Sequence, residues 1–129
     1  MANAVAGGVR VVLRLEGLCI LVAGVLGYAK FGSGWGTFAL FFLAPDLSFA
    51  GYLAGSKAGA IAYNLAHSLV GPLAVLLTGI LLSAPVAVTA GIIWVAHIGL
   101  DRALGYGLKY SAGFKFTHLG VIGQGRTGA

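Results

Sequence analysis

The sequence has few charged residues, and this scarcity decides the class of protein. Only 9% of the 129 residues are charged, whereas 59% are hydrophobic and the mean hydropathy is +0.97. A water-soluble domain carries about 25% charged residues, which it needs to cover its surface. The composition therefore excludes an ordinary soluble domain and predicts a single integral membrane domain over residues 1–129.

The sequence also lacks a second cysteine and a basic patch. Cys19 is the one cysteine, so no intramolecular disulfide can form. The formal net charge is +5, but the basic residues lie at the ends of apolar segments and not in a patch interleaved with aromatic residues. We therefore expect membrane lipids as partners and no nucleic acid.

Long apolar segments make up most of the chain. A membrane-spanning helix needs about 20 mainly apolar residues. Four segments meet this length: 11–29, 35–55, 58–82 and 86–104. The glycine-rich tail, 105–129, is too interrupted for another span and suits the membrane–water interface. Because the connections are short, neighbouring helices must be antiparallel, so we predict an all-α protein with a four-transmembrane-helix up-down bundle.

The basic residues orient these segments in the membrane. If the N-terminus is cytoplasmic, seven of the eight lysines and arginines fall on the cytoplasmic side, and Lys30 alone falls outside. Cytoplasmic loops of membrane proteins carry an excess of such residues. We therefore predict a multi-pass protein with both termini in the cytoplasm.

Few side chains could support chemistry inside the membrane, and most of them are acids or histidines. An ionisable group at hydrocarbon depth costs about 3 kcal/mol, so it faces the protein interior, pairs with another group or binds an ion. In the predicted orientation these residues lie in the cytoplasmic half of four helices or on the inner-side tail. We predict that they bind one or two divalent metal ions of unknown identity. The predicted ligands are Glu16, Asp46, His67, His97, Asp101 and His118.

Local spacing supports a shared site. His97 and Asp101 are four residues apart and therefore lie on one face of a helix. Tyr63 and His67 have the same spacing. Pro45 directly precedes Asp46 and predicts a kink, which commonly lines a cavity.

The remaining polar residues near this site suggest how a substrate would bind. Arg102 and Lys109 lie at the level of the inner headgroups and would attract an anionic lipid. Tyr63 and Asn64 are also predicted to bind substrate, although hydrogen bonding between helices is the more common role for such residues. A metal-bound water would attack the substrate. The predicted catalytic residues are Asp46, His97 and Asp101.

Several segments carry a resemblance to a known family. These are Pro45-Asp46-Leu47, Tyr63-Asn64-Leu65-Ala66-His67, His97-Ile98-Gly99-Leu100-Asp101-Arg102, Gly105-Tyr106-Gly107-Leu108-Lys109-Tyr110 and Thr117-His118-Leu119-Gly120. From residue 14 to about residue 123 the chain resembles domain-of-unknown-function family 4260, which consists of small bacterial membrane proteins. The resemblance implies a location in the bacterial inner (cytoplasmic) membrane and implies no activity.

Two looser resemblances point to hydrolysis. The chain is similar to predicted membrane-bound metal-dependent hydrolases, in which Asp46, His67, Thr117 and His118 would fill the conserved roles. In that family a second acid tends to stand where this chain has Ser48. The His97-x-x-x-Asp101 pair also resembles the base-support pair of membrane phosphatidate phosphatases, whose other motifs are absent. Our leading hypothesis is a metal-dependent hydrolase of a lipid-like or small-molecule substrate.

Three alternatives remain open from the sequence. His67 and His97 would suit the axial positions of a haem in an electron-transfer protein. Intramembrane acids and histidines also mark proton or ion pathways, and a transport protein of this size would need to form a homodimer. In a purely structural protein, Glu16 would pair with Arg14 and Asp101 with Arg102.

Overall fold

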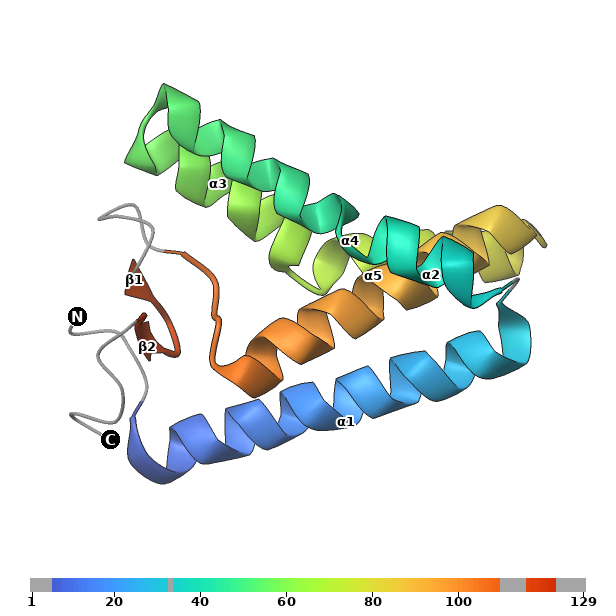
Figure 1. The fold of residues 1–129 in the computed structure, drawn as a ribbon, viewed down its shortest axis with the longest axis horizontal. Coiled ribbons are helices and arrows are strands. Elements are labelled where there is room, and N and C mark those ends of the chain that lie inside the picture. Colours follow the sequence, from blue (N-terminus) through green and yellow to red (C-terminus); the bar gives the residue numbers. More distant parts are fainter. Residues whose placement is uncertain (1–5, 33, 110–115, 123–129) are drawn as a thin grey trace.

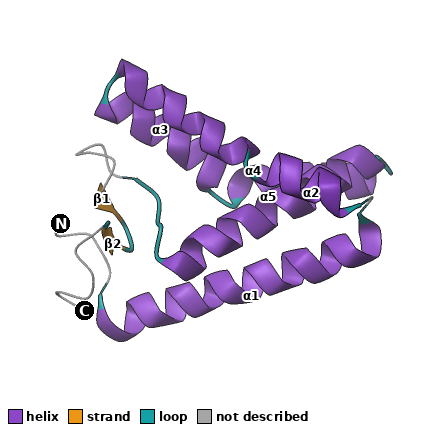
Figure 2. Ribbon diagram, viewed as in Figure 1, coloured by secondary structure: helices purple, strands orange, loops and turns teal. Residues whose placement is uncertain are grey.

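The computed structural model describes residues 6–32, 34–109 and 116–122 (Figure 1). The helices follow in the order α1 (Gly7–Phe31), α2 (Trp35–Phe42), the 3₁₀ helix η1 (Ala44–Ala54), α3 (Ser56–His67), α4 (Val70–Leu81) and α5 (Pro85–Leu104). Two short antiparallel strands, β1 (Phe116–Thr117) and β2 (Gly120–Val121), form a hairpin in the tail (Figure 2). The described chain is therefore almost entirely helical, as predicted.

The three prolines of the chain determine where helices begin. Proline lacks a backbone N–H and its ring clashes with the carbonyl four residues earlier, so it is tolerated only in the first turn of a helix. Pro45 is the second residue of η1, Pro72 the third residue of α4, and Pro85 the first residue of α5. The break at Leu43 corresponds to the kink predicted at Pro45. The break at Ser68 and Leu69 divides the predicted 58–82 helix and is a difference from the prediction.

Three helical segments are long and apolar enough to cross a membrane. They are Trp35–Ala54, which combines α2 and η1, Ser56–Leu81, which combines α3 and α4, and Pro85–Leu104, which is α5. Large apolar side chains lie on the outside, as a membrane protein requires: Leu53 is 92% exposed and Val86 82% exposed. The predicted span 11–29 corresponds to α1, which is not among the three segments, and it remains a prediction.

Helix α5 is the centre of the packing. Helix α1 packs along it, and α2 and α4 also contact it. The α1–α5 contact is close because glycines face the partner backbone: a Cβ on Gly24 would meet Ala96, and a Cβ on Gly99 would meet the backbone of Leu21. Tyr28, Ile92 and Ile93 form the buried core between these helices.

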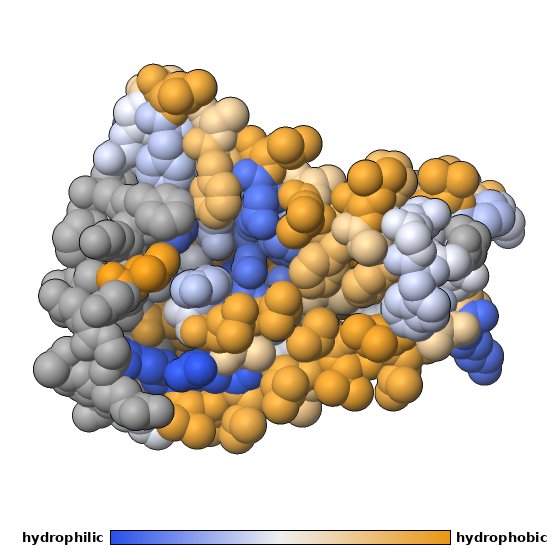
Figure 3. Space-filling model, viewed as in Figure 1, coloured by the Kyte–Doolittle hydropathy of each residue, from blue (hydrophilic) through white to orange (hydrophobic). Residues whose placement is uncertain are grey.

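Helices η1 and α3 pack against each other and lead away from the α1–α5 pair (Figure 1). We call these two helices the η1–α3 hairpin. The prediction of an up-down four-helix bundle is therefore not confirmed. Between the hairpin and α5 the surface is hollowed, and hydrophilic residues are visible there among apolar ones (Figure 3).

The described part of the tail folds back toward this hollow. Helix α5 ends at Gly105, whose left-handed backbone (φ 92°) lets the Tyr106 N–H donate to the Asp101 carbonyl at 2.7 Å. Lys109 then forms a β-bridge with Thr117. The rest of the predicted tail, 110–115 and 123–129, lies outside the described residues.

Candidate metal centre

Two helix breaks position the first pair of side chains. Asp46 lies in the first turn of η1, where its N–H donates to the Leu43 carbonyl at 3.0 Å. His67 is the last residue of α3. Because Pro45 and Pro72 interrupt the two spans at this level, both side chains lie where the η1–α3 hairpin meets the rest of the protein.

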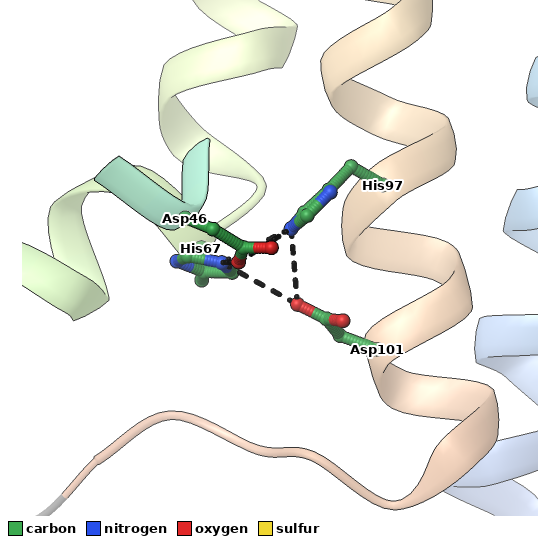
Figure 4. Close-up of side chains that lie close together, drawn as sticks. All are labelled: Asp46, His67, His97 and Asp101. Carbon is green, nitrogen blue, oxygen red and sulfur yellow. Dashed lines mark hydrogen bonds and ion pairs between the residues drawn. The ribbon is translucent and has the colours of Figure 1, made fainter. Parts of the chain in front are cut away.

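Helix α5 supplies the second pair. His97 and Asp101 are separated by one helical turn and lie on the face that looks toward the base of the hairpin (Figure 4). Two pairs of ligands from separate parts of the chain thus converge, as the sequence predicted for these four residues.

The four side chains converge on a common point (Figure 4). The two Nε2 atoms of His67 and His97 are 3.1 Å apart. Asp46 Oδ1 lies 3.2 Å from each of these nitrogens. Asp101 Oδ2 lies 3.4 Å from the His67 nitrogen and 3.3 Å from the His97 nitrogen. All four atoms are within 4.8 Å of one another.

These separations fit the coordination of a small cation. Ligands at about 2.0–2.1 Å from a tetrahedral Zn²⁺ lie about 3.3–3.4 Å from each other. The five separations among the two Nε2 atoms and the two carboxylate oxygens, 3.1–3.4 Å, are close to that value. Two imidazole nitrogens and two carboxylate oxygens are also a ligand set that suits Zn²⁺ and related divalent transition metals. The four residues therefore fit one metal ion.

The surroundings of His67 orient its ring for ligation. Its Nδ1 lies 3.0 Å from the Tyr63 carbonyl, so we assign the proton to Nδ1 and the lone pair to Nε2. Metal-binding histidines usually donate their other N–H in this way. The Tyr63 ring stacks on the imidazole, with ring centroids 3.8 Å apart and planes at 4°. The Phe42 ring of α2 packs against the imidazole of His97, with ring centroids 5.0 Å apart.

The burial of the cluster favours a bound cation. His67 is fully buried, His97 is 3% exposed, and the side chain of Asp101 is 13% exposed. Two ionised carboxylates beside two neutral imidazoles would give a buried charge of −2, which is costly in a low-dielectric site. Protonating both Nε2 atoms would set two N–H groups against each other across 3.1 Å. One divalent cation neutralises both carboxylates without that conflict.

The arginines near the cluster bind backbone carbonyls. Arg14 Nε donates to the Ala103 carbonyl at 2.9 Å. Arg102 donates to the carbonyls of Tyr106 and His67. The structural alternative predicted that Arg14 and Arg102 form ion pairs with acids. In the described part of the chain, these hydrogen bonds go to backbone carbonyls instead. Arg102 instead satisfies a carbonyl that the end of α3 leaves without a helical partner.

Glu16 and His118 lie outside the four-residue group. Glu16 is exposed on α1. His118 lies in the turn between β1 and β2, where its Nδ1 accepts the Leu108 N–H at 2.8 Å and its own N–H donates to the Leu108 carbonyl at 3.1 Å. Burial and the charge of Arg102 lower the pKa of His118. These contacts anchor the tail to the end of α5.

The other predicted substrate-binding residues border the cluster. The Asn64 amide donates to the Lys109 carbonyl at 2.8 Å and accepts the Lys109 N–H at 2.6 Å, so it holds the tail against α3. Lys109 Nζ lies 4.6 Å from the centroid of the Tyr63 ring. Lys109 is 4% exposed, and burial lowers its pKa to about 8. A basic group therefore lies one aromatic ring away from His67.

One supporting residue was not found from the sequence. The Trp94 indole N–H donates to the Ala66 carbonyl, which would otherwise lack a partner where α3 ends. The Val70 N–H, its partner in a continuous helix, donates to Ser68 Oγ at 3.1 Å instead. Pro72 could have indicated this arrangement from the sequence. A proline leaves a free carbonyl four residues earlier, near Ser68, and a neighbouring helix must then supply hydrogen-bond donors.

Comparison with known proteins assigns a family to the chain. The family described as "Domain of unknown function (DUF4260)" matches residues 10–122, and the chain belongs to this family. This confirms the resemblance found from the sequence. No curated protein and no solved structure matches the chain.

Proposed function

We propose that this member of domain-of-unknown-function family 4260 is an integral membrane protein that binds one divalent transition-metal ion through Asp46, His67, His97 and Asp101. We further propose that it hydrolyses a lipid-like substrate at this ion. The observation that carries the proposal is the convergence of four ligand atoms, with separations of 3.1–3.4 Å, in a cluster whose two histidines are buried.

Access to the cluster supports catalysis over a purely structural ion. Structural zinc sites are closed, whereas catalytic sites keep a position open to water or substrate. The side chain of Asp46 is 38% exposed, so water or substrate could reach an ion from that side and add a fifth ligand to the four side chains. A bound metal ion lowers the pKa of a coordinated water to about 7 and polarises an ester or phosphoryl oxygen. Asp46 Oδ2 would be available to take a proton from that water, and Asp101 and His97 would hold the ion.

The membrane setting supports a lipid substrate. Three helical segments are long enough to span the bilayer, and the cluster lies where two of them are interrupted and the third passes by. The distribution of Lys and Arg favours the cytoplasmic half of the inner membrane for the cluster. Lys109 borders the cluster and would attract an anionic group.

The alternative functions receive less support. Axial histidines of a haem lie on opposite sides of the iron, whereas the Nε2 atoms here are only 3.1 Å apart and leave no room for a porphyrin plane. For transport, a polar path would have to continue past the cluster. Helix α2, helix α4 and residues 85–96 of α5 contain no charged side chain, so no observation favours a transporting homodimer.

Metal analysis tests the first part of the proposal. The protein is purified in detergent, and its metal content is measured by inductively coupled plasma mass spectrometry. We expect about one equivalent of a divalent metal in the wild type and in His118→Ala, which removes a histidine outside the group. We expect none in the double variant His67→Ala, His97→Ala. Equal metal content in all three proteins would overturn the proposal.

Lipid hydrolysis tests the second part. The metal-loaded protein is reconstituted in nanodiscs, and lipid products are followed by mass spectrometry. We expect products that vanish with a chelator, return when the metal is restored, and are absent with Asp46→Asn. Products formed equally by the chelated protein would exclude the metal-dependent reaction, and metal binding without any product would limit the function to metal binding.

A further inference from the structure

An apolar groove of about 640 Å³ runs along α5 on the side of α2 and η1. Its lining is mainly apolar and includes Phe31, Phe41, Val86, Ile93 and Trp94. The volume is within the range of about 300–1,000 Å³ typical of small-molecule sites.

One end of the groove is lined by residues that lie close in the sequence to three of the four cluster residues. Its lining contains Pro45, which precedes Asp46 in the chain, and Ala66, which precedes His67. Trp94, three residues before His97, lines the same end and is tied to Ala66 by its indole N–H. Three of the four ligands therefore have a near neighbour in the wall of the groove.

The groove extends from the cluster along the helix axis. Its lining continues on α5 from Trp94 to Val86, eight residues that correspond to about 12 Å of helix. The hydrocarbon core of a bilayer is about 30 Å thick, so the groove is slightly shorter than the half of that thickness that one lipid chain occupies. A hydrocarbon chain that lies along the membrane normal would match this length and direction.

The polar lining of the groove includes a hydroxyl near the cluster. Ser48, two residues after Asp46, lines the groove. Its Oγ is buried and has no hydrogen-bond partner among the described residues. A buried hydroxyl without a partner costs free energy, and an ester oxygen at the end of a bound chain would satisfy it.

We propose that this groove binds the hydrocarbon chain of the lipid substrate and presents to the metal cluster the ester bond attached directly to that chain. The proposal rests on the proposed function and narrows its substrate class to lipids with an acyl ester or a chain-linked phosphate ester. A phosphodiester within a distant headgroup would not reach the cluster while the chain fills the groove.

Water is the only co-reactant that the corresponding reaction needs. With an acyl ester, the water oxygen bonds to the carbonyl carbon, the bond from that carbon to the alcohol oxygen breaks, and the alcohol leaves with a proton. With a chain-linked phosphate, the water oxygen bonds to phosphorus, the bond from phosphorus to the chain oxygen breaks, and the chain leaves as an alcohol. No oxidant or reductant is involved.

Photo-crosslinking tests chain binding. The protein is placed in nanodiscs of phosphatidylethanolamine that contain phosphatidylglycerol with a diazirine on one acyl chain. We expect crosslinks on residues 86–94 and 41–48 to exceed those on the exposed α4 residues Leu73 and Leu77 about tenfold. Equal labelling of the groove and of the exposed α4 residues would mean that the groove holds only ordinary bilayer lipid, and would overturn the proposal.

A filled groove provides the matched control. Ala90→Trp places an indole in the groove, whereas Leu77→Trp adds bulk to an exposed α4 position outside it. We expect Ala90→Trp to lower groove labelling about tenfold, and Leu77→Trp to leave it unchanged. Both variants should retain the metal, which separates a failure of the groove from a failure of the metal site. Unchanged labelling in Ala90→Trp would contradict the proposal.

Product analysis identifies the ester class. The two substrates are phosphatidylglycerol and a long-chain alkyl phosphate. A free fatty acid from the former, or a long-chain alcohol from the latter, supports cleavage at the chain end. Release of glycerol or glycerol phosphate from intact diacyl lipid would overturn cleavage at the chain end. Such a result would still be compatible with metal-dependent hydrolysis.

Discussion

His67 Nε2 and His97 Nε2 lie 3.1 Å apart, although the residues are separated by 30 positions and belong to different helices. The two Nε2 atoms face each other, so they cannot both carry a proton, because the two N–H groups would then point at each other. A cation between the two nitrogens and the two carboxylates would resolve this conflict.

Asp101 is expected to contribute more to metal affinity than Asp46. Asp101→Asn replaces a mostly buried anionic ligand with a neutral amide, so we expect affinity for Zn²⁺ to fall about 100-fold or more. Asp46→Asn should cost less, because its side chain is 38% exposed and water can take the position of its oxygen. Competition with a chelator of known affinity measures both. The control is Glu16→Gln, an exposed acid outside the group, and a comparable loss in this variant would contradict the assignment.

Lys109 makes stability depend on pH. Burial lowers its pKa to about 8 in the folded protein, compared with 10.5 for an exposed lysine. Between these values the unfolded chain binds more protons, so the free energy of unfolding should rise as the pH increases from about 8 to about 10. Lys109→Met keeps most of the side-chain stem and should flatten this rise.

Thermal unfolding in detergent, followed by tryptophan fluorescence, measures the effect. Lys57→Met is the control, because Lys57 is exposed. If Lys109→Met and Lys57→Met change the pH profile equally, the buried ammonium group is not its cause.

Asn64 is expected to hold the tail on α3. Asn64→Leu removes both hydrogen bonds to Lys109, each worth about 1 kcal/mol, so the Lys109 amide should exchange with deuterium about tenfold faster or more. Asn64→Asp keeps the acceptor for the Lys109 N–H and should retain much of the protection. Hydrogen exchange measured by mass spectrometry tests this. Unchanged exchange in Asn64→Leu would show that other contacts hold the tail.

Trp94 is expected to stabilise the break between α3 and α4. Trp94→Phe leaves the Ala66 carbonyl without its donor, which should cost about 1–3 kcal/mol of unfolding free energy. The other tryptophan provides the control, because Trp35 is 52% exposed and Trp35→Phe keeps an aromatic ring in contact with Tyr28. Denaturant titration in mixed micelles compares the two. Equal losses would contradict a specific role for the Trp94 N–H.

The four converging ligands could be predicted because the membrane makes polar residues informative. Asp46, His67, His97 and Asp101 lie in strongly apolar segments, and the i,i+4 spacing of the last two already assigns them to one face. Glu16 was included on the same reasoning. The sequence does not reveal that the close α1–α5 packing uses glycines at positions 17 and 24, and Glu16 is exposed in the structure.

The remaining differences arise from local backbone geometry. Pro45 predicts its break because it precedes a polar residue at mid-span, whereas Pro72 stands in an apolar stretch that reads as one helix. His118 was predicted to reach the cluster, but the two-residue strands on either side of its turn direct it to Leu108. Such a contact depends on tertiary pairing of the tail, for which the sequence carries little periodic signal.

The η1–α3 hairpin has a mechanical consequence for the whole molecule. Its two helices pack on each other, while α5 packs on α1, α2 and α4. In the described part of the chain, the hairpin is connected to α5 and the tail by the ligand cluster, the Arg102–His67 bond, the Trp94–Ala66 bond and the Asn64–Lys109 bonds. A cation at the cluster would therefore add a further link between the hairpin and α5, and its removal would weaken the attachment of the hairpin to the rest of the protein.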